Sequence, residues 1–292
     1  MKKNGILIIG IPGTTLTHQD KAWLKHKDVA GIILFKHNFE SKNQIEALCR
    51  DIRQHREDLF ICVDHEGGRV QRFKDGFSII PPMGTLGQLY AIDPKAAVDQ
   101  ARVYGELIAK ELGEVGIDFS FAPVLDLDYG VSQIIGDRAF NADPLIVSEL
   151  AGSFIDGFHE FEMVACGKHF PGHGYVAPDS HIADPVDERP LSVIYENDLI
   201  PYIKLCDKLD AIMTAHILFP EVDSEIVSYS PIWIKEILRN DLGYQGLIIS
   251  DDLVMHAAAK GSPKERVKKA LDAGCDMILY CQDYKGIEEL LS

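Results

Sequence analysis

Residues 246–251 read GLIISD, a short apolar run that ends in a carboxylate. The run shows no alternation of apolar and polar residues, which is typical of a parallel strand covered on both faces. Seven further runs of this kind span residues 6–10, 31–35, 59–64, 119–127, 163–169, 211–216 and 275–281. Eight parallel strands are the number that closes a (β/α)₈ barrel, so the sequence predicts this α/β fold.

The segments between these runs carry signals of helices. In residues 262–274, Ser262 suits the N-cap, Pro263 the first helical position, and Glu265 completes a capping box. Residues 230–243 repeat the pattern of serine, proline and a final glycine. No low-complexity tract or linker marks a boundary, so we expect one TIM-barrel domain over residues 1–292.

A doubly wound open sheet would explain the same alternation of strands and helices. Such a sheet normally places a glycine-rich phosphate loop after its first strand. Residues 8–16 (IIGIPGTTL) offer glycines, but neither G-x-G-x-x-G nor G-x-x-x-x-G-K-[ST] is present. The barrel is therefore the favoured architecture.

Composition narrows the possible partners and compartments. Of the 292 residues, 46% are hydrophobic and 25% are charged, as in globular proteins with ample core. A formal net charge of −16 argues against nucleic acid or an anionic membrane as the main partner. No apolar run approaches the roughly 18 to 20 residues of a membrane span. We expect a small-molecule ligand instead, which a local cationic cleft can bind despite the overall charge.

The N-terminus and the cysteines favour the cytoplasm. The opening MKKNGILIIGIPG begins like a signal peptide, but Gly10 and Pro12 interrupt its apolar run and no small-residue cleavage site follows. The six cysteines have no metal-ligand spacing, and four of them lie in strand-like runs where cysteine acts as a small hydrophobe. A first β-strand and a reducing compartment are the simplest interpretation.

Charged side chains recur where the predicted strands end. A lone aspartate at a strand end is more often a helix cap or a solvated charge. Here five successive strands end in such groups, and the C-terminal ends of barrel strands meet on one face, where catalytic groups of this fold lie. The residues in question are Asp64, Asp126, Asp128, Lys168, His169, His216, Asp251 and Asp252.

The segment KHFPGHGYVAPDSH (168–181) places three histidines on a stretch that cannot form a regular helix. Its glycines and prolines predict a loop, and loops often present chemistry on a rigid scaffold. The spacing H-F-P-G-H would chelate zinc only on a helix, which Pro171 and Gly172 exclude. We therefore expect neither a metal nor an organic cofactor.

Four motifs together carry a family resemblance. They are VDHEGGRVQRF (63–73), GDRAF (136–140) followed by DP, KHFPGHG (168–174) with DSH downstream, and SDDLVM (250–255). The set resembles the family 3 glycoside hydrolases, and more closely the bacterial single-domain β-N-acetylglucosaminidases of cell-wall recycling. The resemblance extends from the first strand to AGCDMILYC (273–281). One departure is Asn141, where a glycine is common, so the turn there can differ.

The resemblance implies a retaining mechanism, which needs a nucleophile and an acid/base. It assigns the nucleophile to Asp251, with Asp252 as a helix cap or a neighbouring support. It assigns the acid/base to His181, with Asp179 as the partner of the ring. Histidine titrates near neutral pH, and a carboxylate beside it can orient the ring and stabilise its cation.

The resemblance also implies that five residues bind the sugar: Asp64, Arg72, Arg138, Lys168 and His169. Four other residues stay open at this stage. Arg69 suits a structural ion pair, and His173 suits a loop-shaping hydrogen bond. His216 suits either ligand contact or support, and Met255 either the core or the wall of the site.

The sequence thus predicts a cytoplasmic exo-enzyme that removes terminal non-reducing N-acetylglucosamine through a covalent glycosyl-enzyme. By resemblance, the substrates are muropeptides bearing anhydro-N-acetylmuramic acid, and we expect a monomer or a weak homodimer. A β-glucosidase or β-xylosidase of the same family is one alternative. A non-catalytic muropeptide-binding barrel is another, and phosphate in place of water as acceptor stays open.

Overall fold

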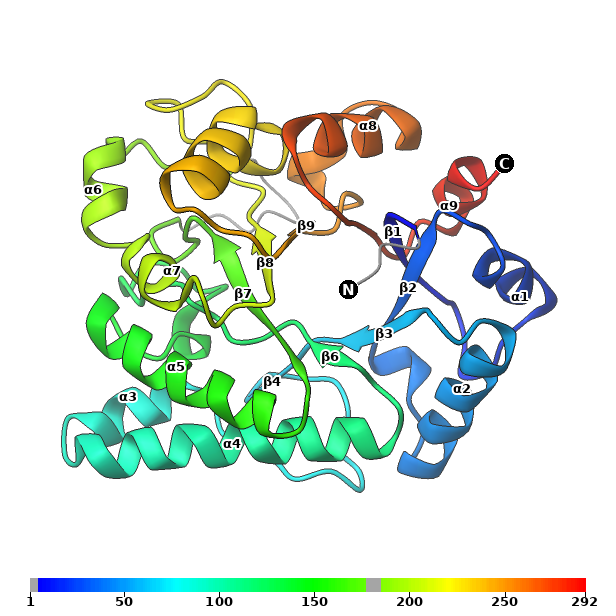
Figure 1. Ribbon diagram of the computed structural model, residues 1–292, viewed down its shortest axis with the longest axis horizontal. Helices are drawn as coiled ribbons and strands as arrows, with labels where there is room; N and C mark the ends of the chain where they lie inside the picture. The colour runs from blue at the N-terminus through cyan, green and yellow to red at the C-terminus, as the bar shows by residue number, and fades with distance from the viewer. Residues whose placement is uncertain (1–4, 177–184) are drawn as a thin grey trace.

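The computed structural model describes residues 5–176 and 185–292, and eight parallel strands form its central sheet (Figure 1). Their order is β10-β1-β2-β3-β6-β7-β8-β9. The two ends of this order meet in a parallel bridge between Ile249 and Met277, where Ser250 N donates to Met277 O at 3.0 Å. The sheet therefore closes into a barrel, as predicted. The strands are β1 (Leu7–Gly10), β2 (Val29–Leu34), β3 (Phe60–Val63), β6 (Phe119–Ser120), β7 (Val164–Phe170), β8 (Ala211–Thr214), β9 (Leu247–Ser250) and β10 (Ile278–Tyr280).

Helical segments follow each barrel strand and lie around the outside of the barrel (Figure 1). The α-helices are α1 (His18–Leu24), α2 (Lys42–His55), α3 (Gly84–Tyr90), α4 (Pro94–Glu114), α5 (Pro144–Glu160), α6 (Leu191–Glu196), α7 (Ile200–Leu205), α8 (Pro263–Ala273) and α9 (Tyr284–Leu290). Short 3₁₀ segments are η1 (Lys36–Asn38), η2 (Gly136–Arg138), η3 (Val227–Tyr229) and η5 (His256–Ala258). Trp23 of α1 stacks on Tyr284 of α9 with ring centroids 6.5 Å apart, which joins the first and last helices.

The helix signals read from the sequence are confirmed, with one difference in winding. In α8, Ser262 Oγ accepts from Glu265 N at 3.3 Å, and Glu265 Oε2 accepts from Ser262 N at 2.8 Å. The second predicted helix is η4 (Ile232–Asp241), where Ser230 Oγ likewise accepts from Trp233 N at 3.1 Å. This helix is a π-helix. The capping pattern thus located its start, although capping does not determine which turn of helix follows.

Strand β6 is much shorter than the run of residues 119–127 predicted. The strand ends at Ser120, and Ala122–Pro123 is a cis peptide bond. Proline has no N–H to donate to a neighbouring strand, so the regular ladder stops there. Pairing resumes at an isolated bridge between Val124 and Lys168. The segment therefore still lies beside β7, which brings Asp126 next to that strand.

A hairpin that the sequence analysis did not predict follows β3. It consists of β4 (His65–Gly67) and β5 (Val70–Gln71), which pair antiparallel. The turn contains Gly67 at φ 114° and Gly68 at φ 56°, a left-handed region that favours glycine. The hairpin holds the side chains of the EGGRVQR motif above the barrel.

No helix in residues 5–176 and 185–292 is both long and apolar enough to cross a membrane.

Candidate active site

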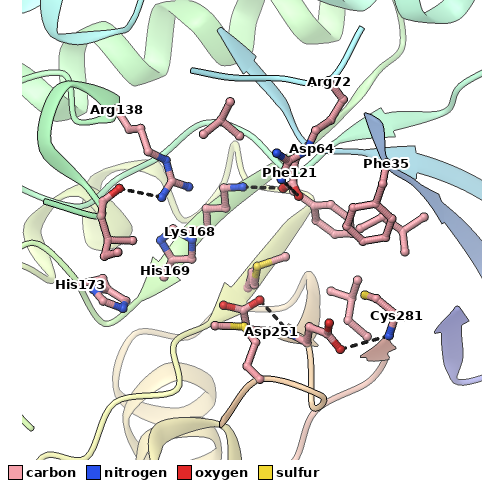
Figure 2. A pocket seen from close by; sticks show the side chains of 17 residues that line it. Phe35, Asp64, Arg72, Phe121, Arg138, Lys168, His169, His173, Asp251 and Cys281 are labelled. Carbon is pink, nitrogen blue, oxygen red and sulfur yellow. Dashed lines mark hydrogen bonds and ion pairs between the residues drawn. The ribbon is translucent and has the colours of Figure 1, made fainter. Parts of the chain in front are cut away.

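A pocket of about 200 Å³ opens at the C-terminal ends of the barrel strands (Figure 2). Its walls come from β2, β3, β6, β7, β8, β9 and β10 and from the loops that follow them. Of the eight charged residues expected on this face, five line the pocket (Asp64, Lys168, His169, Asp251 and Asp252), and Asp126, Asp128 and His216 do not. The lining residues are Ile33, Phe35, Asp64, Val70, Arg72, Phe121, Ile134, Arg138, Lys168, His169, His173, Met213, Asp251, Asp252, Met255, Leu279 and Cys281.

Asp64 holds two of the cations in this pocket. Its Oδ1 accepts from Lys168 Nζ at 2.9 Å, and its Oδ2 accepts from Arg72 Nη2 at 3.1 Å. Burial alone would raise the pKa of Asp64, but the charges of Lys168 and Arg72 outweigh burial and hold the pKa well below its usual range. Asp64 is therefore an anion at neutral pH, and each oxygen keeps a lone pair that a ligand hydroxyl can use.

Glu66, on the hairpin strand β4, links Lys168 to Arg138. Glu66 Oε1 lies 2.6 Å from Lys168 Nζ and 2.7 Å from Arg138 Nη2, while Oε2 accepts from Arg138 Nε at 2.9 Å. Burial would raise the pKa of Glu66, but Arg138 and Lys168 outweigh it and lower the pKa to about 2. Burial would in turn lower the pKa of Lys168, yet Asp64 and Glu66 raise it above its ordinary value. The buried network is thus fully charged.

Sequence reasoning missed Glu66. It lies in the quoted motif VDHEGGRVQRF, between the predicted site residues Asp64 and Arg72. The balance of charges in the predicted site could have indicated Glu66, because buried cations such as Lys168 and Arg138 need an anion. Asp64 alone could not pair with all three cations.

Asp126 organises the two histidines of the KHFPGHG motif. Its Oδ2 lies 2.7 Å from His169 Nδ1, and its Oδ1 accepts from the backbone N–H of His173 at 2.7 Å. A carboxylate only accepts, so His169 Nδ1 donates and Nε2 is the nitrogen left for a ligand. The bond preceding His169 is a cis peptide. The sequence analysis placed Asp126 at a strand end but did not assign it to His169.

The neighbouring carboxyl groups Asp251 and Asp252 differ in their surroundings. Asp251 follows β9 and lines the pocket, and its Oδ1 accepts from the backbone N–H of Asp252 at 2.8 Å. Asp252 Oδ1 accepts from the backbone N–H groups of Val254 and Cys281, each at 3.1 Å. Burial raises the pKa of Asp252 to about 6. The Asp252 carboxylate therefore joins β9 to the end of β10, while the Asp251 carboxylate makes no such link between strands in the described part of the chain.

The four residues that the sequence left open occupy different positions. His216 does not line the pocket; its ring lies between Ser228 Oγ, at 2.8 Å from Nδ1, and the carbonyl oxygen of Asp252, at 3.0 Å from Nε2. Arg69 pairs with Asp137 at 3.4 Å, outside the lining residues. Met255 and His173 both line the pocket. Burial lowers the pKa of His173, which favours the neutral ring.

Two predicted residues, Asp179 and His181, lie outside the described residues. The six other predicted site residues all line one pocket: Asp64, Arg72, Arg138, Lys168, His169 and Asp251. Within residues 5–176 and 185–292, no group of three or more His, Cys, Asp or Glu side chains is arranged to hold a metal ion.

The pocket combines a network of polar groups with two further carboxyl groups, Asp251 and Asp252. In this network of alternating charges, Arg72, Asp64, Lys168 and Arg138 line the pocket, so a ligand with several hydroxyl groups finds both donors and an acceptor there. Phe35, Phe121 and Met213 supply apolar surface between them. Such a pocket suits a sugar ring, and a carboxylate at the wall of a pocket is a group that can act as a nucleophile.

Comparison with known proteins agrees with this chemistry. The glycosyl hydrolase family 3 N-terminal domain matches residues 4–292. The chain belongs to glycosyl hydrolase family 3. The β-hexosaminidases of Bordetella avium (strain 197N) and Hydrogenovibrio crunogenus are 50% and 46% identical to this family 3 chain. These two alignments cover 98% and 99% of the chain and 83% and 82% of the relatives.

Solved structures of family 3 enzymes share the fold. Native NagZ from Neisseria gonorrhoeae superposes with a TM-score of 0.94 at 42% identity, covering 99% of this chain and 84% of that one. The same enzyme in complex with N-trifluoroacetyl-D-glucosamine gives a TM-score of 0.95 at 41% identity, again covering 99% and 84%. The predicted fold and family are confirmed, and this family 3 chain is a glycoside hydrolase of the β-N-acetylhexosaminidase type.

Proposed function

We propose that the enzyme is a retaining exo-β-N-acetylglucosaminidase that releases terminal non-reducing N-acetylglucosamine from peptidoglycan-derived muropeptides in cell-wall recycling. The observation that carries the proposal is the position of Asp251 in one pocket with five polar groups suited to sugar hydroxyls. The relatives named β-hexosaminidase, and a NagZ solved with an N-acylated glucosamine, support the choice of sugar.

In the proposed first step, a carboxylate oxygen of Asp251 attacks the anomeric carbon while the glycosidic bond to the leaving oxygen breaks. His181 donates its proton to that oxygen, so the leaving group departs as an alcohol. In the second step, His181 takes a proton from a water molecule, whose oxygen attacks the anomeric carbon and frees Asp251. Asp179 orients the ring of His181 and stabilises its cationic form.

Five residues hold the sugar during both steps in this proposal. Arg72, Arg138 and Lys168 donate to its hydroxyl and N-acetyl oxygens, and Asp64 accepts from its hydroxyl groups. His169 contributes Nε2, because its Nδ1 is engaged by Asp126. Charge-assisted hydrogen bonds of this kind are stronger than neutral ones and hold the ring over Asp251.

We further propose that the reaction takes place in the cytoplasm. All six cysteines are free thiols, and five of them are buried. A reducing compartment suits such a set, because oxidising compartments favour disulfides.

Trapping the glycosyl-enzyme tests the proposed function. A fluorinated N-acetylglucosamine analogue with a good leaving group slows the second step, so the covalent adduct accumulates. We expect the intact mass to increase by one glycosyl unit and peptide mapping to place that unit on Asp251. An adduct on Asp252, or turnover with no adduct at all, would contradict the assignment.

A further inference from the structure

His216 lies beside the turn that carries Asp251. It follows β8 and is only 1% exposed, and it is not among the residues that line the pocket. Its Nε2 lies 3.0 Å from the carbonyl oxygen of Asp252, the residue after Asp251. The ring therefore contacts the backbone next to the proposed nucleophile rather than the pocket itself.

The hydrogen-bond partners of His216 determine where its proton lies. A carbonyl oxygen only accepts, so Nε2 carries a hydrogen and donates it to Asp252. Burial lowers the pKa of His216, which favours the neutral ring, and the second nitrogen of a neutral ring can only accept. Ser228 Oγ, which lies 2.8 Å from Nδ1, therefore donates its hydrogen to the ring.

Two buried hydroxyl groups extend this hydrogen bond into a chain. Thr214 Oγ1 lies 2.6 Å from Ser228 Oγ, and both residues are fully buried. Because the single hydrogen of the Ser228 hydroxyl goes to the ring, Thr214 donates to Ser228. The contact of Ser228 Oγ with the carbonyl oxygen of Ala215 is longer, at 3.2 Å. The chain runs from Thr214 through Ser228 to His216 and holds the ring in one tautomer.

The backbone of Asp252 connects His216 to Asp251. Its N–H donates to Asp251 Oδ1 at 2.8 Å. Its carbonyl oxygen accepts from Met255 N at 3.0 Å as well as from His216. A rotation that turned this N–H away from Asp251 would also move the carbonyl oxygen and break the bonds that it accepts. His216 therefore stabilises the backbone conformation that holds the carboxylate of Asp251.

Both neighbouring strands hold the turn after β9 in place. The strands on either side of β9 are β8 and β10. His216 contacts the turn from the loop after β8, and the side chain of Asp252 joins the turn to Cys281 at the end of β10. A nucleophile reacts fastest at about 3–3.5 Å from its target, and a displacement of about 1 Å can slow the reaction about a hundredfold. A change in these contacts should therefore alter the rate of attack more than the binding of the sugar.

We propose that His216 is a positioning residue for the reaction: as the Nε2–H tautomer that Ser228 maintains, it fixes Asp252 and thereby orients the carboxylate of Asp251 toward the anomeric carbon. The proposal rests on the proposed function, in which Asp251 is the nucleophile, and extends it to residues outside the pocket. Loss of this chain lowers the rate at which the sugar is transferred to Asp251 and leaves the affinity for the sugar unchanged.

Two amide variants test which nitrogen of His216 matters. The amide nitrogen of glutamine is as many bonds from Cα as Nε2 of histidine, and that of asparagine as many as Nδ1. Only His216→Gln therefore keeps a donor for the carbonyl oxygen of Asp252. The measurement is the rate of covalent labelling by the fluorinated N-acetylglucosamine analogue as a function of its concentration.

We expect His216→Asn to lower the maximal rate of labelling by about tenfold or more, the scale of one lost hydrogen bond together with a displaced nucleophile. The half-saturating concentration should stay within about twofold of the wild-type value, because the groups that bind the sugar are unchanged. His216→Gln should recover most of the rate. Circular dichroism measures the folded fraction of each variant, and rates are compared per folded molecule.

Ser228→Ala tests the tautomer without removing the ring. Without the hydroxyl, nothing keeps the hydrogen on Nε2, and a ring protonated on Nδ1 turns a lone pair toward the carbonyl oxygen of Asp252. We expect the maximal rate to fall about threefold or more. Ser148→Ala is the control, because it removes a buried hydroxyl on α5 that donates to Pro144 O at 2.6 Å, outside the pocket. Its rate should equal that of the wild type.

The inference is overturned if His216→Asn and His216→Gln are labelled equally fast, or if Ser228→Ala is labelled as fast as Ser148→Ala. It is also overturned if the half-saturating concentration of His216→Asn rises while its maximal rate is unchanged. If the wild type forms no adduct on Asp251, the proposed function itself fails, and this inference falls with it.

Discussion

Glu66 and Arg138 form a two-pronged ion pair, with Nε and Nη2 of the guanidinium 2.9 and 2.7 Å from the two carboxylate oxygens. The side chains are only 4% and 11% exposed, so water contributes little to their solvation. Because Glu66 Oε1 also lies 2.6 Å from Lys168 Nζ, one carboxylate fixes two cations that line the pocket. Glu66 itself does not line the pocket and acts through these two neighbours.

The variant Glu66→Gln tests this positioning role. The amide retains one oxygen but turns an NH₂ group toward a cation, so Arg138 and Lys168 lose their fixed positions. We expect kcat/KM on a chromogenic N-acetylglucosaminide to fall by at least about tenfold, mainly through KM, because hydrogen bonds to charged groups contribute about 1.5–3 kcal/mol each. Steady-state kinetics separates KM from kcat.

The variant Glu66→Asp is the matched control, since it keeps the charge and shortens the side chain by one methylene. It should recover part of the lost affinity. If Glu66→Gln instead lowers kcat and leaves KM unchanged, or if both variants are equally impaired, Glu66 does not act by positioning the two cations.

Asp251→Ala should abolish turnover while the fold persists. Removal of a nucleophile takes away the covalent route, and we expect kcat to fall by a factor on the order of 10⁴ or more. The assay is release of chromophore from an N-acetylglucosaminide, with thermal unfolding as the check on folding. Activity close to that of the wild type would remove Asp251 from the mechanism.

The barrel was predictable because its strands are apolar on both faces. Runs such as residues 246–251 contain few charges that could mark another structure, and β9 covers four of those six residues. The prediction failed where one residue overrides the pattern, as Pro123 ends the ladder of β6. The hairpin β4–β5 was missed because its strands have three and two residues, too short for any periodicity to show.

The site was predictable where one residue follows one strand, as for Asp64 and Asp251. Pairings between strands were not predictable, because they depend on neighbours far apart in the chain. Asp126 contacts His169, 43 positions later, and Glu66 contacts Arg138, 72 positions later. No local spacing encodes such contacts, and the closure of the barrel creates them.

His181→Ala should affect substrates according to their leaving groups. A poor leaving group needs a proton as the bond breaks, whereas a dinitrophenolate does not. We expect a loss of about a hundredfold or more on a disaccharide but a much smaller loss in the glycosylation step with a dinitrophenyl N-acetylglucosaminide. Pre-steady-state release of dinitrophenol measures that step. Equal losses on both substrates would show that His181 is not the acid.

Asp252 makes stability depend on pH. Its pKa is raised by burial from 3.8 to about 6, so between these values the folded state binds more protons than the unfolded state. The contribution of Asp252 to the free energy of unfolding therefore falls as pH rises through this window and is level above about pH 6. Asp252→Asn removes this contribution and keeps an oxygen that can accept from Val254 N and Cys281 N.

Urea unfolding at about pH 4.5 and about pH 7 measures the effect. The free energy of unfolding of Asp252→Asn, relative to that of the wild type, should be more favourable at the higher pH. A difference that is the same at both pH values, or larger at the lower one, would show that the carboxyl is not desolvated as its position indicates.

Arg189 closes a second buried charge cluster, distinct from the pocket. Its Nη2 lies 2.7 Å from Asp187 Oδ2 and its Nη1 lies 2.9 Å from Asp198 Oδ2, and the two carboxylates are almost fully buried. The guanidinium also lies 4.9 and 4.1 Å from the ring centroids of Tyr129 and Tyr175. The cluster joins residues on both sides of segment 177–184. Because Asp187 and Asp198 are buried, water could not solvate their carboxylates if Arg189 were removed.

Arg189→Met should therefore lower the free energy of unfolding by about 3–5 kcal/mol, the usual cost of leaving buried carboxylates without their partner. Arg102→Met is the control, because Arg102 pairs with Glu106 and Glu160 but is 45% exposed. Exposed pairs contribute about 0–1 kcal/mol, since water solvates the charges that remain. Urea unfolding of both variants at neutral pH compares them directly. Equal losses would mean that the burial of Asp187 and Asp198 does not determine how much Arg189 contributes to the free energy of unfolding.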